Sequence, residues 1–146
     1  MALIINGNNT SEEIIGTFKT EKIYGFGGDD TIFSGARDLS LSDPNRDSIY
    51  GGSGDDLISL DDGGYVDGES GNDSIFGSNG DDTIYGGTGN DSVYGGEGRD
   101  KIYLGKGDDL AFAGSDDYYA NTIDGGDGND LAAYDMTDDV ASVVGF

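Results

Sequence analysis

The chain contains no cysteine and no histidine among its 146 residues. Disulfide bonds are therefore excluded, and so is any zinc or redox site that depends on Cys or His ligands. A single proline, Pro44, accompanies 28 glycines, which excludes a collagen-like chain and a proline-rich linker. No uninterrupted apolar run approaches the length of a membrane span. The chemistry left to the chain is mainly that of oxygen atoms from carboxylates, hydroxyls and backbone carbonyls.

Basic residues are also scarce, because 7 Lys and Arg accompany 30 Asp and Glu and leave a net charge of −23. Nucleic acid is excluded as a partner, since phosphate binding needs Lys and Arg, and anionic membrane surfaces are disfavoured. Without counter-ions, a chain of this charge is expected to be expanded or disordered. Residues 1–7 have neither a basic region nor a long apolar run, so a secreted form is expected to use no cleaved N-terminal signal.

What the chain has in abundance is a nine-residue repeat. Residues 77–112 form four consecutive blocks, GSNGDDTIY, GGTGNDSVY, GGEGRDKIY and LGKGDDLAF. Each block has Gly at its fourth position, Asp at its sixth, a small or branched aliphatic residue at its eighth and an aromatic residue at its ninth. A fixed short period of this kind is typical of a solenoid.

Each block is interpreted as one tight turn followed by one very short strand. Its first six residues are rich in Gly, Asn and Asp, which favour turns with positive φ, and its last three residues favour β-structure. Because side chains alternate across a strand, only the eighth residue must face inward. Two blocks then make one coil, with one strand in each of two facing sheets. The predicted fold class is all-β, a solenoid of about 13 rungs in which each block supplies one rung.

Stacking the turns places Asp carboxylates and backbone carbonyls of alternate blocks above one another. Such a column of carboxylates would repel unless it is neutralised, and a cage of six to eight hard oxygen ligands at roughly 2.3–2.6 Å is what Ca²⁺ takes. Calcium is therefore predicted as a cofactor that forms part of the fold. The candidate metal-binding carboxylates are Asp30, Asp56, Asp73, Asp82, Asp91, Asp100, Asp109 and Asp130. The candidate metal-binding glycines are Gly25, Gly27, Gly52, Gly54, Gly71, Gly80, Gly87, Gly89, Gly96, Gly98, Gly107, Gly126 and Gly128.

Alternate turns fall on opposite edges of the solenoid, and the two edges differ in composition. One edge, called here the Asp-rich edge, carries Asp30, Asp56, Asp73, Asp91, Asp109 and Asp130. The other, called the mixed edge, carries Glu21, Asp47, the turn near Gly64, Asp82, Asp100 and the segment before Ile123. Counting sandwiched pairs predicts about five ions on the Asp-rich edge and one to three on the mixed edge. About six ions would offset about 12 of the negative charges.

The blocks at residues 51–59, 86–94, 95–103 and 125–133 resemble the RTX (repeats-in-toxin) family, whose repeat is G-G-x-G-x-D-x-U-x. The resemblance implies a right-handed parallel β-roll that binds calcium. It implies a structural or secretion-assisting module of a bacterial type I secreted protein, which folds on meeting extracellular calcium. It also leaves open a carbohydrate- or surface-binding module, either adhesin-like or accessory to a polysaccharide enzyme. The expected partners are calcium ions and, under the second interpretation, a polysaccharide or a neighbouring domain.

The repeat departs from its pattern at both ends and at three internal places. Glu12 and Glu21 stand at the sixth position and Thr10 and Lys19 at the fourth, so the first two blocks are expected to bind calcium weakly or not at all. Loops are expected at 34–46 and 113–121, and 60–67 is one residue short of a block. Residues 1–6 are predicted to form an N-terminal cap. Residues 134–146 are predicted to be a closing strand, a C-terminal secretion signal, or both. The whole span 1–146 is predicted to form one domain.

Two further sets of side chains should form ladders along the solenoid. Ninth-position aromatics are expected to point outward, either as cross-rung stacks or as a platform for a sugar or a neighbouring module. They are Phe33, Phe76, Tyr94 and Phe112 on one sheet and Tyr24, Tyr50, Tyr85 and Tyr103 on the other. Fifth-position side chains are expected to be solvated or hydrogen-bonded locally; they are Asp29, Asp55, Asp81, Asp108, Asn72, Asn90 and Asn129. Because the repeat already accounts for the acids, no catalytic residue is predicted and the chain is not expected to be an enzyme.

Overall fold

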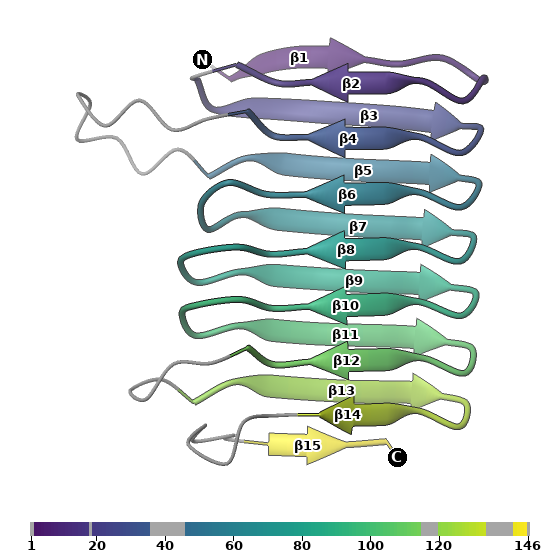
Figure 1. Ribbon diagram of the computed structural model, residues 1–146, viewed down its shortest axis with the longest axis vertical. Coiled ribbons are helices and arrows are strands. Elements are labelled where there is room, and N and C mark those ends of the chain that lie inside the picture. Colours follow the sequence, from purple (N-terminus) through teal and green to yellow (C-terminus); the bar gives the residue numbers. More distant parts are fainter. Residues whose placement is uncertain (1, 18, 36–45, 115–119, 134–141, 146) are drawn as a thin grey trace.

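The computed structural model describes residues 2–17, 19–35, 46–114, 120–133 and 142–145, and shows two facing sheets wound from one chain (Figure 1). Sheet A contains β1 (Leu3–Asn6), β3 (Glu21–Gly27), β5 (Ser48–Ser53), β7 (Tyr65–Ser70), β9 (Thr83–Thr88), β11 (Lys101–Lys106), β13 (Thr122–Asp127) and β15 (Ser142–Val144). Sheet B contains β2 (Glu13–Ile15), β4 (Thr31–Phe33), β6 (Leu57–Ser59), β8 (Ser74–Phe76), β10 (Ser92–Tyr94), β12 (Leu110–Phe112) and β14 (Leu131–Ala133). The described part of the chain has no helix long and apolar enough to cross a membrane.

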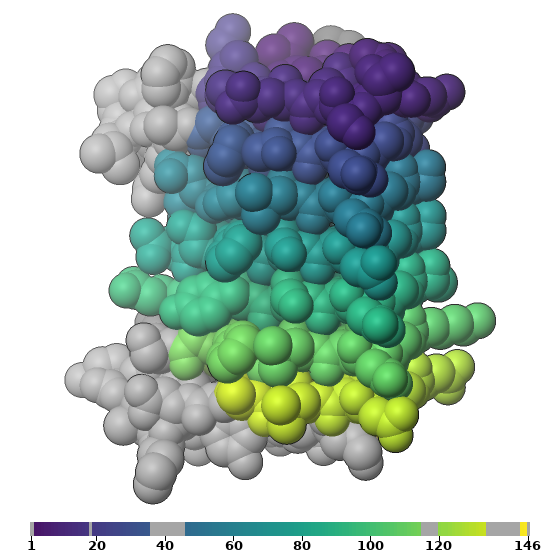
Figure 2. Space-filling model, turned by 45° about the vertical axis from the view of Figure 1, so that its right-hand side comes forward, coloured from purple at the N-terminus to yellow at the C-terminus, as the bar shows by residue number. Residues whose placement is uncertain are grey.

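The chain alternates between the two sheets, so each coil adds one strand to each sheet. All neighbouring strands are parallel, and eighth-position residues align from rung to rung, as Ile84 does with Val66 and Ile102. On sheet B, Val93 aligns in the same way with Ile75 and Ala111. The space-filling view shows the coils as layers in sequence order from one end to the other (Figure 2). The predicted all-β parallel β-roll is therefore confirmed.

The number of rungs differs slightly from the prediction, because the end segments also pair with the sheets. β1 pairs with β3 at one end, and β15 pairs with β13 at the other. Thirteen one-strand rungs were expected between two caps, and the described residues form 15 strands. Most of the predicted loops 34–46 and 113–121, and residues 134–141 and 146 of the predicted C-terminal segment, lie outside the described residues.

Strand length differs between the sheets, which the repeat did not predict. Strands of sheet B have three residues, whereas the internal strands of sheet A have six or seven. β9 continues through Gly86 and Gly87 into the next block, and Gly87 pairs with Gly105. Gly87 has φ of 116°, and a Cβ there would collide with the carbonyl oxygen of Glu69. Glycine thus lets the strands of sheet A approach one another closely beyond their expected ends.

The core consists of two facing columns of aliphatic side chains, one from each sheet. The eighth-position residues of the repeat from Ile14 to Ile123 are buried, as predicted. Three further residues, Leu60, Leu104 and Ala113, occupy the first position of their blocks and are also buried. Sequence analysis missed them because most first positions hold glycine. Roughly one inward aliphatic side chain per rung makes a thin core, so the fold needs stabilisation from its turns.

The outer face of sheet A carries a continuous ladder of tyrosine rings. Tyr24 stacks on Tyr50, and Tyr85 on Tyr103, each pair with centroids 4.8 Å apart. Asp67 interrupts the ninth-position column, and Tyr65 fills the gap with its ring 5.6 Å from Tyr50 and 5.7 Å from Tyr85. The Tyr65 hydroxyl donates to Asp67 at 3.2 Å, and burial raises the pKa of Tyr65 to about 12. Cross-rung stacking is thus present on sheet A, with a member from the seventh position that the repeat did not indicate.

Candidate metal centre

The six aspartates of the Asp-rich edge form one column, in the short turns at the right-hand edge of Figure 1. Each carboxylate reaches the preceding coil, where its Oδ1 accepts the backbone N–H of the residue at the same position. Asp56 N–H donates to Asp73 at 2.8 Å, and Asp91 N–H donates to Asp109 at 2.7 Å. The same bond links Glu12 to Asp30, Asp30 to Asp56, Asp73 to Asp91 and Asp109 to Asp130. The structure therefore brings together all the residues that sequence analysis placed on this edge.

The second oxygen of each predicted carboxylate is buried without a hydrogen-bond partner. This holds for Oδ2 of Asp30, Asp56, Asp73, Asp82, Asp91, Asp100, Asp109 and Asp130. A buried polar group costs free energy unless it is paired, and a buried charge costs much more. Eight repeated cases on two columns therefore indicate that something else neutralises these oxygens. A divalent cation between coils fits, because it satisfies several oxygens at once.

The space beside each Oδ2 is lined by backbone oxygen. A Cβ built on Gly86 would lie 2.6 Å from Asp91 Oδ2 and 2.6 Å from the carbonyl oxygen of Leu104 in the next coil. At Gly51 the corresponding distances are 2.5 Å to Asp56 Oδ2 and 2.9 Å to the Gly68 carbonyl. Absence of a side chain at these first positions leaves an oxygen-lined cradle. Sequence analysis named first-position glycine only at Gly25, although the repeated G-G pair contained the signal.

The second- and fourth-position glycines stack their carbonyl groups along the turns. Gly89 has φ of 129°, and a Cβ there would collide with the carbonyl oxygen of Gly71. Among the predicted glycines, positive φ is found at Gly52, Gly54, Gly71, Gly80, Gly87, Gly89, Gly96, Gly98, Gly107, Gly126 and Gly128. Gly25 and Gly27 lie in β3 without positive φ. Most of the predicted glycines therefore allow backbone oxygens of successive coils to stand close together, as a hard-cation site requires.

Burial raises the pKa of several of the column carboxyls. The pKa of Asp82 rises to about 8 and that of Asp73 to about 7. The pKa of Asp56 and that of Asp91 each rise to about 6. In each case desolvation is the largest cause, the backbone N–H bond opposes it, and the carboxylate of a neighbouring coil adds to it. Without a cation, the folded columns thus disfavour their charged form.

The mixed edge forms a second column, in which Gly64 and Asn121, like Glu21, stand in place of aspartate. Asp82 N–H donates to Asp100 Oδ1 at 3.0 Å, which confirms that these two residues pair across coils. Asp100 N–H in turn donates to Asn121 Oδ1 at 2.7 Å, and Asn121 is buried with its amide nitrogen unpartnered. Asn121 stands where an acid stands elsewhere, two residues before the inward Ile123, and sequence analysis missed it. Gly64 N–H donates to Asp82 Oδ1 at 2.6 Å, so that turn keeps the backbone bond without supplying a carboxylate.

The comparison with known proteins agrees with this geometry. A family model described as RTX calcium-binding nonapeptide repeat (4 copies) matches residues 6–36, 44–66, 64–93, 76–111 and 85–120. The chain belongs to this RTX family. No curated protein and no solved structure gives a significant match. Membership identifies the fold as a calcium-binding β-roll, which is a structural module.

The first two RTX blocks satisfy their acids without a cation. Glu21 Oε2 accepts the backbone N–H of Thr17 at 2.8 Å, and Oε1 accepts the Thr17 hydroxyl. Glu12 Oε1 accepts the backbone N–H of Asn8 at 2.5 Å, and Oε2 accepts the Asn8 side-chain amide at 3.0 Å. A Cβ on Gly7 would lie 2.8 Å from Glu12 Oε1, so this oxygen stands beside the first-position glycine as Asp Oδ2 does elsewhere. The extra methylene of Glu brings the carboxylate to donors in its own turn.

The fifth-position side chains form a ladder between RTX turns, which corrects the expectation that they are solvated or bonded locally. Asp55 Oδ1 accepts the N–H of Asn72 at 2.7 Å, and Asn72 Oδ1 accepts the N–H of Asn90 at 2.8 Å. Asp81 likewise accepts the N–H of Arg99 at 3.0 Å. These side chains reach the following coil, whereas sixth-position aspartates reach the preceding one. Adjacent turns are therefore joined by hydrogen bonds in both directions.

Proposed function

We propose that this RTX chain is a calcium-folded structural module that assists the export of a bacterial type I secreted protein. The observation that carries the proposal is the set of eight buried Oδ2 atoms without partners, in columns on both edges. The proposed ligands are the eight repeat aspartates and the glycine carbonyls named from the sequence. About six ions are proposed, with about five on the Asp-rich edge.

Calcium binding supplies the free energy that this thin core lacks. Because the sites exist only in the folded chain, binding free energy becomes folding free energy. At a free calcium concentration one hundred times the dissociation constant, each site adds about 2.7 kcal/mol. Several sites together can therefore decide whether the chain folds at all.

The same linkage gives a direction to export. Where calcium is scarce, a chain of net charge −23 stays expanded and can thread a channel. Where calcium is abundant, outside the cell, it folds and cannot return. Extracellular localisation and a type I route are proposed on this basis together with family membership. A secretion signal in 134–146 remains a prediction.

Far-UV circular dichroism titrated with Ca²⁺ and, separately, with Mg²⁺ tests the proposal. We expect coil without metal, β-structure with calcium, and no folding with magnesium, because Mg²⁺ demands a smaller octahedral cage. A metal-stripped chain that retained its sheet signal at neutral pH would refute calcium-driven folding. Secretion from cells carrying a type I exporter, with and without residues 134–146, tests the export role separately.

Polysaccharide binding is the alternative to a purely structural role, and the tyrosine ladder gives it little support. A sugar stacks on an open ring face, whereas the rings of Tyr24 and Tyr50 are nearly parallel at 9° and cover one another. The Tyr85 and Tyr103 rings do the same at 13°. Glycan-array binding with and without calcium separates the two functions.

A further inference from the structure

The outer face of sheet B is almost free of charge. Each of its seven strands turns two residues outward, and Glu13 is the one charged residue among these fourteen positions. Seven of the outward residues are large apolar side chains that are 38–63% exposed, namely Ile15, Phe33, Leu57, Phe76, Tyr94, Phe112 and Leu131. On a chain of net charge −23, an apolar strip along the whole sheet indicates a contact surface.

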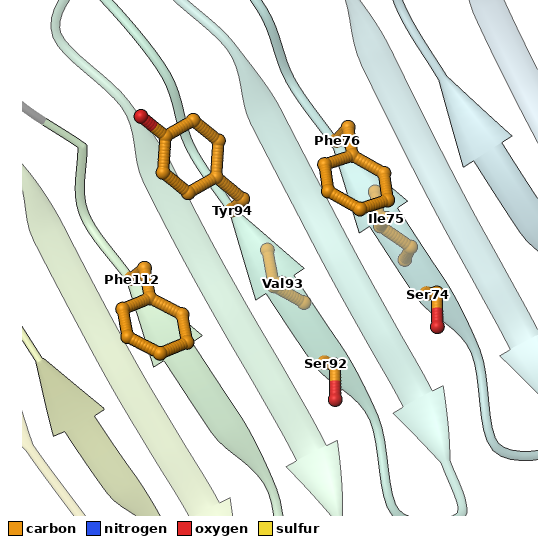
Figure 3. Close-up of a pocket in the computed structure, with 7 residues that line it drawn as sticks. All are labelled: Ser74, Ile75, Phe76, Ser92, Val93, Tyr94 and Phe112. Atoms are coloured by element: carbon orange, nitrogen blue, oxygen red, sulfur yellow. The ribbon is translucent and has the colours of Figure 1, made fainter.

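A groove runs along this strip beside the aromatic rings. Phe76, Tyr94 and Phe112 project from β8, β10 and β12 on the outer side, while Ser74 and Ser92 line the groove with short side chains (Figure 3). Its volume is about 380 Å³. Unlike the tyrosines of sheet A, these rings make no ring-to-ring stack among the described residues. Their faces and the groove are open to a partner.

We propose that the outer face of sheet B is the interface of a symmetric dimer of this chain. If each of the seven large side chains, four aromatic and three aliphatic, is taken to present about 180 Å², their exposed fractions correspond to roughly 600 Å² of apolar surface per face. Two faces together reach about 1,200 Å², which is the lower end of specific interfaces. The dimer is therefore expected to be weak but specific.

Charge favours a second copy at this face over contact anywhere else on the molecule. Two chains of the same negative charge repel at every surface that carries carboxylates, and that repulsion falls only over a Debye length of about 8 Å at physiological salt. Two sheets packed face to face stand about 10 Å apart, with both edges directed away from the contact. The uncharged strip is thus where two copies approach at least cost.

The face is also complementary to itself. The order of sheet B is β14-β12-β10-β8-β6-β4-β2, so β8 is its central strand. A two-fold axis along the solenoid would lay each strand over its own copy with reversed direction. The Phe76 ring of one copy would then lie over Ser74 of the other, and Tyr94 over Ser92. Rings of one copy enter the serine groove of the other at equal rung spacing, as an isologous interface requires.

This inference rests on the proposed function to one extent, because the face exists only in the calcium-folded chain. Bound calcium also lowers the net charge of each copy. It therefore promotes association both by folding the face and by reducing the repulsion between copies. Added salt should strengthen the dimer by screening the remaining charge, provided that calcium stays saturating. A partner with a basic surface would show the opposite dependence on salt.

Analytical ultracentrifugation in saturating calcium, from micromolar to millimolar protein, tests the dimer. We expect a monomer–dimer equilibrium that Phe76→Glu weakens at least tenfold, because the two introduced carboxylates meet near the symmetry axis. Phe26→Glu is the matched control. Phe26 is 50% exposed against 45% for Phe76, but lies on sheet A, so this variant should associate like the unmodified chain.

Circular dichroism on the same samples distinguishes failure of the dimer from failure of calcium folding. If Phe76→Glu does not fold, Phe112→Glu on the same groove replaces it as the test. A folded chain that stays monomeric throughout would overturn the proposal, and so would equal weakening by Phe26→Glu. A neutral polysaccharide that bound the folded monomer through this face would likewise assign the groove to another occupant.

Discussion

The glutamate turns and the aspartate turns of this solenoid meet the same electrostatic problem in different ways. In both, an acid at the sixth position brings a carboxylate oxygen beside the first-position glycine. Glu21 accepts the N–H and the hydroxyl of Thr17 with its two oxygens, whereas Asp91 accepts the backbone N–H of Asp73 in the preceding coil with Oδ1 and leaves Oδ2 without a partner. One methylene group thus decides whether a turn can be completed by the chain or needs a cation.

This difference suggests how the ends and the middle of the molecule divide their roles. A solenoid needs caps that do not depend on a further neighbour. The turns of Glu12 and Glu21 are the first two, and their acids are satisfied by Asn8 and Thr17 within the same block. Under the proposed function, these turns cover the N-terminal rung at any metal concentration, while the aspartate turns that follow need calcium.

Removing one column aspartate should have the largest effect on this contrast. Asp91 lies between Asp73 and Asp109, so Asp91→Ala eliminates a shared ligand of two proposed sites. At saturating calcium we expect a loss of about 5 kcal/mol, since each site adds about 2.7 kcal/mol at one hundred times its dissociation constant. Urea unfolding and calcium counting by native mass spectrometry measure the stability and the lost ions.

Glu21→Gln is the control for that prediction. It keeps one oxygen acceptor for the Thr17 N–H, replaces the other acceptor with an amide that donates, and removes the charge. We therefore expect a loss of about 1 kcal/mol and an unchanged ion count. Equal losses in the two variants, or an unchanged ion count in Asp91→Ala, would show that the aspartate column does not hold the metal.

Much of this contrast could be predicted from the sequence, because the period of nine fixes which residues share a column. Asp82 and Asp100 were paired correctly on the mixed edge for that reason. The coil to which a side chain forms its hydrogen bond could not be predicted in the same way. An Asp or Asn can bond to the coil before or after it, and only the structure shows that Asp91 and Asn90 take opposite directions.

Residues that replace a missing repeat position were also beyond the sequence pattern. Tyr65 restores the aromatic column that Asp67 interrupts, although it stands two positions earlier. Leu104 fills the inward first position that glycine leaves empty elsewhere. Such replacements depend on which neighbouring side chains can reach the same space, and a nine-residue motif carries no information about that.

Acidification should remove the difference between glutamate and aspartate turns in the metal-free chain, because it neutralises the buried aspartates. The pKa of Asp73 rises to about 7 and that of Asp82 to about 8 on folding, from an ordinary value near 3.8. The folded chain therefore binds more protons than the unfolded chain between those values. Stability from these groups is fully present below about pH 4 and is lost as the pH rises through about 6 to 8. Metal-stripped protein should gain β-structure on acidification, as followed by circular dichroism.

Calcium should reverse that pH dependence, because the ion competes with protons for the same oxygens. At limiting calcium, the midpoint of folding should move to lower calcium concentration as the pH rises through the same window. If the metal-free chain stayed unstructured at every pH, the burial of the Asp columns would not be the cause of its instability.

Shortening the glutamate should convert a self-satisfied turn into a cation-dependent one. In Glu21→Asp the carboxylate no longer reaches Thr17, so one buried oxygen loses its partners as in the aspartate turns. The loss is expected to be about 1–3 kcal/mol, the cost of an unsatisfied buried acceptor.

Since Asp47 Oδ1 in the next coil already accepts the backbone N–H of residue 21 at 2.8 Å, a second aspartate carboxylate would complete a sandwiched pair. The dependence of unfolding free energy on calcium concentration should then steepen by about one ion, whereas Glu21→Gln should lower stability without changing that slope. An unchanged slope in Glu21→Asp would mean that Lys19, which replaces the fourth-position glycine, prevents binding in this turn whatever acid it carries.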